Sequence, residues 1–147
     1  MKAKLIILII TIFSIVCCNT IMNISKADND NNITEKYWKL KTLQGRQVSM
    51  TKNQEREIFI TLKKADNTVI GFAGCNILSG SYTLDEGNRI NFRNVAVTIR
   101  ACPDVNINES EFLEAFELAD NYTIVNDVLT LNIARAPLAV FEAVYMN

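Results

Sequence analysis

The chain has 147 residues, of which 49% are hydrophobic and 21% charged, and its net charge is −1. This composition is typical of one folded domain, and it excludes a disordered chain. No cluster of lysines and arginines indicates a phosphate-binding face, so nucleic acid is not an expected partner. The sequence contains no histidine, which removes the commonest general base and most zinc ligand sets. We therefore expect no enzyme activity, no metal and no cofactor.

The first residues predict an export signal. Lys2 and Lys4 precede an apolar run over residues 5–16. As a helix this run rises only about 18 Å, too short for a bilayer core of about 30 Å, so a cleaved signal peptide explains it better than a permanent span. Residues 15–18, Ile-Val-Cys-Cys, resemble a bacterial lipobox in which Cys18 accepts the lipid and anchors the protein in the cell envelope.

An ordinary signal peptidase cut after Ala27 is the alternative, and it would release a soluble secreted or periplasmic protein. Residues 19–34 are rich in Asn and Asp, which favour local turns over helix or strand. We expect a signal peptide over residues 1–18, a flexible tether over 19–34 and one folded domain over 35–147.

Short alternating segments predict a mainly β body. Turn residues at 44–46, 65–67, 85–88 and 126–127 separate runs in which apolar and polar residues alternate. Their spacing of roughly ten residues indicates an antiparallel meander that curls or closes into a barrel. The expected strands cover residues 37–42, 58–62, 68–73, 80–84, 89–92, 95–101, 122–125, 128–133 and 138–145, and the sixth stops before Pro103 because proline cannot donate to a ladder.

One helix is expected over residues 109–119. Asn108 is a suitable N-cap, and Glu111 lies three residues later in a capping-box arrangement. At 100° per residue one side of this helix is apolar, formed by Phe112, Ala115, Phe116 and Ala119. A single helix cannot cover both faces of the sheet, so we expect it to plug one end of the barrel or to lie across one side.

The segment over residues 71–82 contains Gly71, Gly74 and Gly80, which predict a sharply turning backbone. It also contains Cys75, and Cys102 is the only other cysteine outside the leader. In an exported protein two such cysteines are expected to form a disulfide. The 27-position loop would stabilise the domain by roughly 3.5 kcal/mol. Two buried reduced thiols are an alternative, and a redox role is another, although no Cys-x-x-Cys motif is present.

Several of these residues together resemble the META domain family, which includes the heat-inducible bacterial lipoprotein HslJ. The resemblance covers residues 37–145 and is carried by Trp38, Gly71, Gly74, Cys75, Asn76, Gly80, Tyr82, Thr98, Cys102 and Pro103. It implies a compact, lipocalin-like antiparallel barrel with one helix, exported and often lipid-anchored, with links to stress tolerance. It implies no catalytic chemistry.

The candidate binding residues favour structural roles. Asn76 suits a turn and Thr98 a strand, and Trp38 and Tyr82 are expected in the core or at the barrel mouth. Two functions remain open: a non-enzymatic envelope module that binds another envelope protein, and a small barrel that carries an apolar ligand. Inhibition of an exported enzyme is a third, by fold analogy alone. A central cavity would favour the carrier, and an exposed apolar patch beside residues 74–80 the envelope module.

Overall fold

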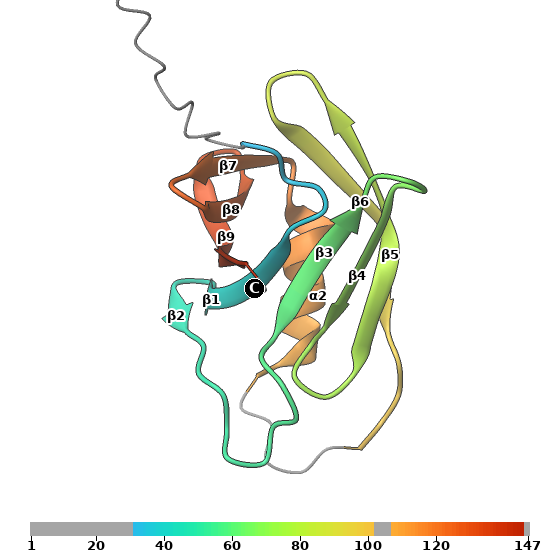
Figure 1. Ribbon diagram of the computed structural model, residues 1–147, viewed down its shortest axis with the longest axis vertical. Helices are drawn as coiled ribbons and strands as arrows, with labels where there is room; N and C mark the ends of the chain where they lie inside the picture. Colours follow the sequence, from blue (N-terminus) through green and yellow to red (C-terminus); the bar gives the residue numbers. More distant parts are fainter. Residues whose placement is uncertain (1–30, 102–106, 146–147) are drawn as a thin grey trace, which may run out of the picture.

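The computed structural model describes residues 31–101 and 107–145. The predicted signal peptide with Cys18, most of the predicted tether, and the predicted positions Cys102 and Pro103 lie outside these residues. The described elements, shown in Figure 1, are β1 (Tyr37–Leu43), β2 (Arg46–Gln47), β3 (Phe59–Lys63), β4 (Thr68–Phe72), β5 (Ile77–Asp85), β6 (Arg89–Val97), α2 (Glu109–Leu118), β7 (Asn121–Val125), β8 (Val128–Ile133) and β9 (Ala136–Val144).

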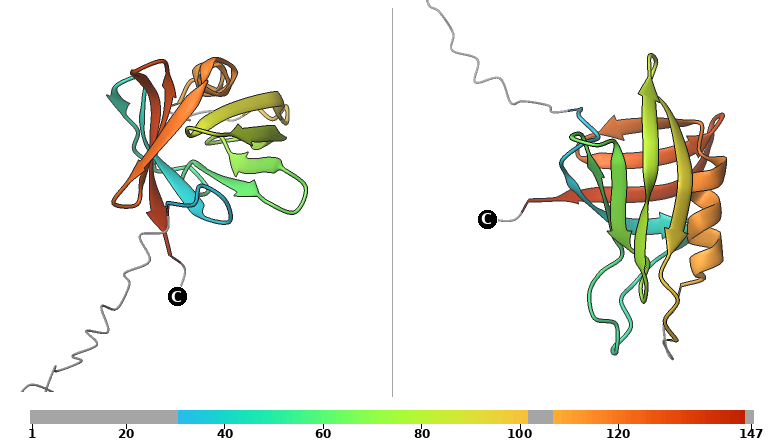
Figure 2. Two further views of the ribbon diagram at one scale, coloured as in Figure 1. Left: turned by 90° about the horizontal axis from the view of Figure 1, so that it is seen from above. Right: turned by 90° about the vertical axis from the view of Figure 1, so that its right-hand side faces the viewer.

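The strands form one antiparallel sheet that curls into a ring (Figure 2). Neighbours along the chain pair in order from β3 to β9, and β9 also pairs with β1, from Tyr37 opposite Val144 to Leu43 opposite Ala139. Between β6 and β7 the contact narrows to one pair, Arg89 opposite Asn121. The predicted fold class, mainly β and antiparallel with one helix, is confirmed.

The helix α2 covers the side of the ring where β6 and β7 diverge (Figure 2). Phe116 packs edge-on against Phe92 of β6, with ring centroids 5.0 Å apart, and Phe112 reaches Phe141 of β9 at 6.4 Å. Of the two expected positions, the helix therefore takes the one across a side. None of the helices in the described part of the chain has the length and apolar character needed to cross a membrane.

The helix begins as predicted at Asn108, whose side chain accepts a hydrogen bond from the backbone N–H of Ser110 at 3.1 Å. The predicted capping box is wrong in its second half. The carboxylate of Glu111 accepts from the side-chain amide of Asn108 at 3.4 Å and pairs with Arg46 of β2. The arginine competes successfully because a charged donor binds a carboxylate more strongly than a neutral amide does.

The interior of the ring is filled by side chains that alternate inward along each strand. Trp38 is fully buried, and its indole N–H donates to the carbonyl oxygen of Ile33 at 2.7 Å. Ile33 is itself buried, so the packed body includes residues just before position 35. The largest buried side chains are Trp38, Phe112, Phe116, Phe141, Ile33, Ile60, Leu62, Leu78, Leu129, Leu131 and Val69. All strands and this core lie within residues 31–145, so the body can be produced without the leader.

The strand after the 85–88 turn differs from the prediction. The sequence predicted two strands, over 89–92 and 95–101, but β6 is continuous from Arg89 and ends at Val97. Asn94, which lies between the predicted pieces, has a φ of 53° and accompanies a register shift against β5. Asparagine tolerates this left-handed conformation, so the strand carries a bulge here and continues. The partner strand β5 begins at Ile77, three residues before the predicted start.

Only one of the three glycines predicted to turn the chain does so. Gly74 has a φ of +97° and lies in the turn between β4 and β5. Gly71 and Gly80 lie inside strands, where a Cβ atom would stand 2.2 Å from the carbonyl oxygen of Phe59 and 2.8 Å from the Val95 side chain. These two glycines are therefore required by close approach between strands, which the sequence does not reveal.

The two ends of the described body meet at a charged cluster. The ammonium group of Lys36 lies 3.4 Å from Oδ1 of Asp127, and the hydroxyl of Tyr145 donates to the same oxygen at 2.6 Å. Lys36 also lies over the Trp38 ring, 5.5 Å from its centroid. The Tyr145 hydrogen bond, followed by that of Lys36, lowers the pKa of Asp127, and the Asp127 hydrogen bond raises the pKa of Tyr145.

We predict that Gly71→Ala destabilises the body by about 3 kcal/mol, because the new methyl group forces β3 and β4 apart. Urea unfolding of residues 31–147 measures the loss. Gly87→Ala is the control. It has a φ of +77° and open space around it, so it carries only the left-handed backbone cost of about 1 kcal/mol. Equal losses in the two variants would contradict the close-approach role.

We predict that Asp127→Asn narrows the acid dependence of stability. A folded pKa below the usual 3.8 means that the carboxylate contributes stability above that value, and the contribution is lost as the pH falls through the folded pKa. Wild type should therefore exceed the variant in stability at pH 7, and the difference should shrink below about pH 4. Urea midpoints measured from pH 2 to pH 7 test this, and a constant difference would contradict it.

Candidate functional site

Four segments meet at one end of the ring, which we call the distal end: residues 43–50, 73–77, 98–101 and 107–111. Hydrogen bonds and a shared pocket join them. In Figure 1 this end lies at the bottom, and the first described residues lie at the top. The second view in Figure 2 shows the same separation. The distal end is therefore the part of the body farthest from the entry of the chain.

The side chain of Asn76 organises the distal end from a nearly buried position, with only 3% of its surface exposed. Its oxygen accepts hydrogen bonds from the Thr98 hydroxyl at 2.9 Å and from the Arg100 backbone N–H at 2.8 Å. Its amide nitrogen donates to Glu109 at 2.9 Å, and its backbone N–H donates to the other oxygen of that carboxylate at 3.1 Å. We call these four residues the corner clamp.

The corner clamp joins three segments that are remote in sequence. The hydroxyl of Thr98 also accepts from the backbone N–H of Ile77 at 3.2 Å, so the start of β5 is bound to the segment that follows β6. Glu109, the first residue of α2, fastens the same corner to the helix. Burying an amide is costly unless it is hydrogen-bonded, and here donors and acceptors are matched. The structural interpretation of Asn76 and Thr98 therefore agrees with their geometry.

Sequence reasoning missed Glu109 as a member of this site. An acidic residue in the first turn of a helix is common because it interacts favourably with the helix dipole, so nothing local distinguished it. Its partner lies 33 positions earlier. A contact of this range has no pattern in a single sequence.

Cys75 is buried beside the corner clamp. Its sulfur lies 3.6 Å from the carbonyl oxygen of Arg100. The predicted partner Cys102 lies outside the described residues, as does Pro103, so the pairing of the two cysteines stays a prediction.

The predicted aromatic positions lie in the core. Trp38 is fully buried, and Tyr82 of β5 is nearly so, with its hydroxyl donating to the carbonyl oxygen of Lys63 at 3.2 Å. Burial raises the pKa of Tyr82. Neither ring offers an exposed face for stacking a ligand. A second pocket, of about 460 Å³, touches Tyr82 at the other end of the ring, and its remaining lining is formed by Asn32, Thr34, Lys64, Asn67, Thr83, Leu84 and Asp85.

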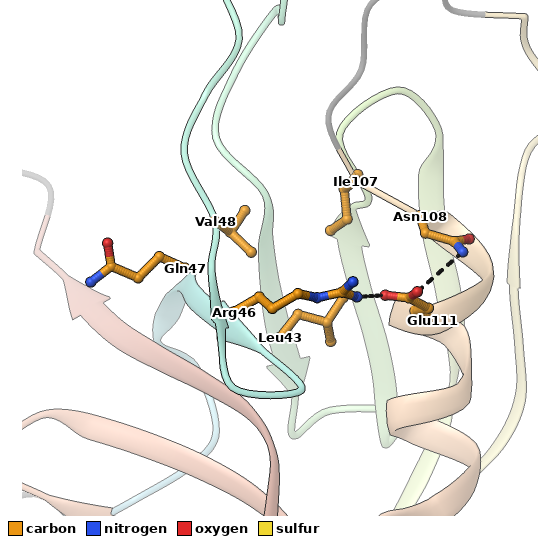
Figure 3. A pocket seen from close by; sticks show the side chains of 7 residues that line it. All are labelled: Leu43, Arg46, Gln47, Val48, Ile107, Asn108 and Glu111. Carbon is orange, nitrogen blue, oxygen red and sulfur yellow. Dashed lines mark hydrogen bonds and ion pairs between the residues drawn. The ribbon is translucent and has the colours of Figure 1, made fainter.

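A pocket of about 500 Å³ opens at the distal end between the β1–β2 turn and the start of α2. Figure 3 shows Val48 and Ile107 on its two sides and Arg46 reaching across to the carboxylate of Glu111. The buried Leu43 also lines it, with Gln47 and Asn108. The guanidinium side chain is 66% exposed and the carboxylate side chain only 27%. We call this space the distal pocket.

Large apolar side chains are exposed around the distal end. Ile77, directly after Asn76, is 59% exposed, and Ile99, between Thr98 and Arg100, is fully exposed. Met50 projects nearby from the segment after β2. Within residues 31–101 and 107–145, no group of three potential metal ligands is present. The chemistry on offer at this end is therefore apolar contact next to one exposed cation.

We predict that Asn76→Ala destabilises the body by about 3 kcal/mol, because it leaves the groups of Thr98, Arg100 and Glu109 without their buried partner. Asn91→Ala is a matched control on the exposed face of β6, where the lost contact is one surface hydrogen bond to Arg93. It should change stability by less than about 0.5 kcal/mol. Urea unfolding compares the two, and similar losses would contradict the role of the clamp.

Comparison with known proteins gives the same fold. A protein from Burkholderia xenovorans, solved by NMR, is 22% identical, with 78% of this chain and 85% of that chain covered and a TM-score of 0.62. Another NMR structure is 20% identical, covers 75% of this chain and 91% of its own, and has a TM-score of 0.57. No curated protein matches. The sequence profile of the META domain matches residues 31–145, and the chain therefore belongs to the META domain family.

Proposed function

We propose that this META domain is a non-enzymatic binding module of the cell envelope, and that its distal end docks a protein partner. One observation carries the proposal: Ile77 and Ile99 are exposed on backbone that the corner clamp holds in place. Exposed apolar residues grouped beside a pocket are typical of interaction sites.

The position of the two isoleucines within the corner clamp supports docking. Ile77 follows Asn76, and its own N–H is bound by Thr98, while Ile99 lies between two clamp residues. Their backbone is therefore ordered before any partner arrives. Because association is opposed by the entropy of ordering flexible segments, preordered contact residues bind at lower cost.

The filled interior argues against the alternative function, the transport of an apolar ligand. Trp38, Phe112, Phe116 and Phe141 occupy the space inside the ring and are almost completely buried. A ligand in this position would have to displace several aromatic side chains, each of which contributes a few kcal/mol to the core. Docking at the surface requires no such displacement.

The proposal includes an address at the membrane surface, in the stress-response setting that the family resemblance implies. A lipid on Cys18 would anchor the chain ahead of the described body, and the distal end lies opposite the first described residues. We also propose a disulfide between Cys75 and Cys102. The Cys75 sulfur is 3.6 Å from Arg100, and two further residues span at most about 7 Å, which brings Cys102 within reach.

Site-specific photo-cross-linking in the native envelope tests the docking proposal. A benzophenone amino acid at position 77 or 99 of the full-length protein should give a discrete protein adduct. The matched control is position 125, because Val125 is 63% exposed but lies on the β7–β8 hairpin. We expect no adduct there, and we expect Cys18→Ser to reduce the adducts because the unanchored protein is diluted away from a membrane-bound partner.

The substitutions Ile77→Ser and Ile99→Ser provide a second measurement. Both side chains are exposed, so each variant should retain stability within about 0.5 kcal/mol of wild type and still lose the partner in affinity capture. Adducts of equal yield from position 125, or adducts that contain lipid alone, would contradict docking at the distal end.

A further inference from the structure

We propose that the distal pocket receives an apolar side chain of the partner, next to a partner residue that carries a carboxylate. The occupant is an extended peptide segment in which, for example, Leu precedes Asp. This inference rests on the proposed docking function and adds the chemistry of the contact. It follows from the shape of the pocket, from the unequal exposure of its two charges, and from the rigidity of its walls.

The size and lining of the distal pocket suit one apolar side chain. Its volume of about 500 Å³ falls in the range of pockets that hold specific ligands. Val48 and Ile107 face each other across it, and Leu43 links it to the core (Figure 3). A leucine or phenylalanine placed between them would remove apolar surface from water on all three residues, which is the main favourable term in association.

The charges of the distal pocket favour an anionic neighbour. Glu111 already receives two donors, from Arg46 and from the Asn108 amide, and only about a quarter of its side chain is exposed. Arg46 is two-thirds exposed, and one of its terminal nitrogens, Nη2, contacts Glu111. A guanidinium group has five N–H donors, and its planar fork suits a second carboxylate. The pocket therefore presents its cation to solvent and covers its anion.

The two walls of the distal pocket are held at a fixed separation by a double contact. The β1–β2 turn binds α2 through Arg46 and Glu111, and again through the Gln44 side-chain amide, which donates to Glu114 at 3.2 Å. The helix is in turn fastened to the corner by Glu109. A pocket whose walls are fixed in this way does not need to open before it binds.

Methyl-detected NMR titration of residues 31–147 tests the inference with defined probes. The peptide acetyl-Ala-Leu-Asp-Ala-amide should shift the methyl signals of Leu43, Val48 and Ile107. The matched probes carry Asn in place of Asp, which removes the charge, or Ser in place of Leu, which removes the apolar anchor. Each should bind about tenfold more weakly, because a charge-assisted hydrogen bond or one buried apolar side chain contributes about one decade of affinity.

Protein variants separate the role of Arg46 from general damage. Arg46→Gln should bind the Asp and Asn peptides equally and still show shifts at the three methyl groups. Gln47→Ala is the control, because this neighbouring side chain points away from the other residues that line the distal pocket (Figure 3). It should retain the roughly tenfold preference for Asp. The dispersed methyl spectrum of each variant confirms that it is folded.

Three results would overturn the inference: equal binding of the Asp and Asn peptides by wild type, shifts confined to Ile77 and Ile99, or no shift at roughly 5 mM peptide. Its failure can be told apart from failure of the docking proposal. Cross-links from positions 77 and 99 without peptide selectivity would overturn the distal pocket alone. Selective peptide binding without such cross-links would support the pocket and overturn docking through the two isoleucines.

Discussion

A buried amide determines the geometry of the distal end. The Asn76 side chain is surrounded by hydrogen-bonding groups from the Thr98–Arg100 segment and from Glu109, which enter the site from different parts of the chain. Unsatisfied, such a group would be among the most costly in the core, because burial removes its water without replacing it. Satisfied, it aligns three backbone segments at once. The exposed positions of Ile77 and Ile99 follow from this alignment.

The helix connects this polar clamp to the apolar core. The sheet is closed on one side by the long pairing of β1 with β9, but β6 and β7 meet at one pair only. Phe112 and Phe116 of α2 fill that opening. The first turn of the same helix carries Glu109 to the corner and Glu111 to the distal pocket. Loss of core packing under the helix would therefore change the distal surface, although the two share no residue.

The sequence predicted the features that depend on neighbours along the chain. Alternation of apolar and polar residues located most strands, and Asn108 correctly marked the start of the helix. The same reasoning failed where the cause lies across the sheet. The two-residue strand β2 has no repeat to detect, and Gly71 was assigned to a turn although it is needed where β3 comes too close for a Cβ atom.

For the site, the sequence found Asn76 and Thr98 but not their carboxylate partner, and it did not indicate that Arg46 would meet Glu111. Glutamates in the first turn of a helix have an adequate local explanation. Only the folded chain shows that one of them is used by a buried amide and the other by an exposed arginine. The membership of such a site is a property of the tertiary structure, so residue types alone do not reveal it.

The entry of the chain is fixed independently of the distal end. Glu35 receives the backbone N–H of Lys64 and the Lys63 ammonium group, and its own N–H donates to the carbonyl oxygen of Leu62. Trp38 binds the carbonyl oxygen of Ile33. Any force that the preceding chain exerts on the body therefore enters at β1 and β3, at the opposite end from the corner clamp. A module built in this way can be held by its N-terminal side and still present an unchanged binding surface, because no contact of the clamp lies on the path of that force.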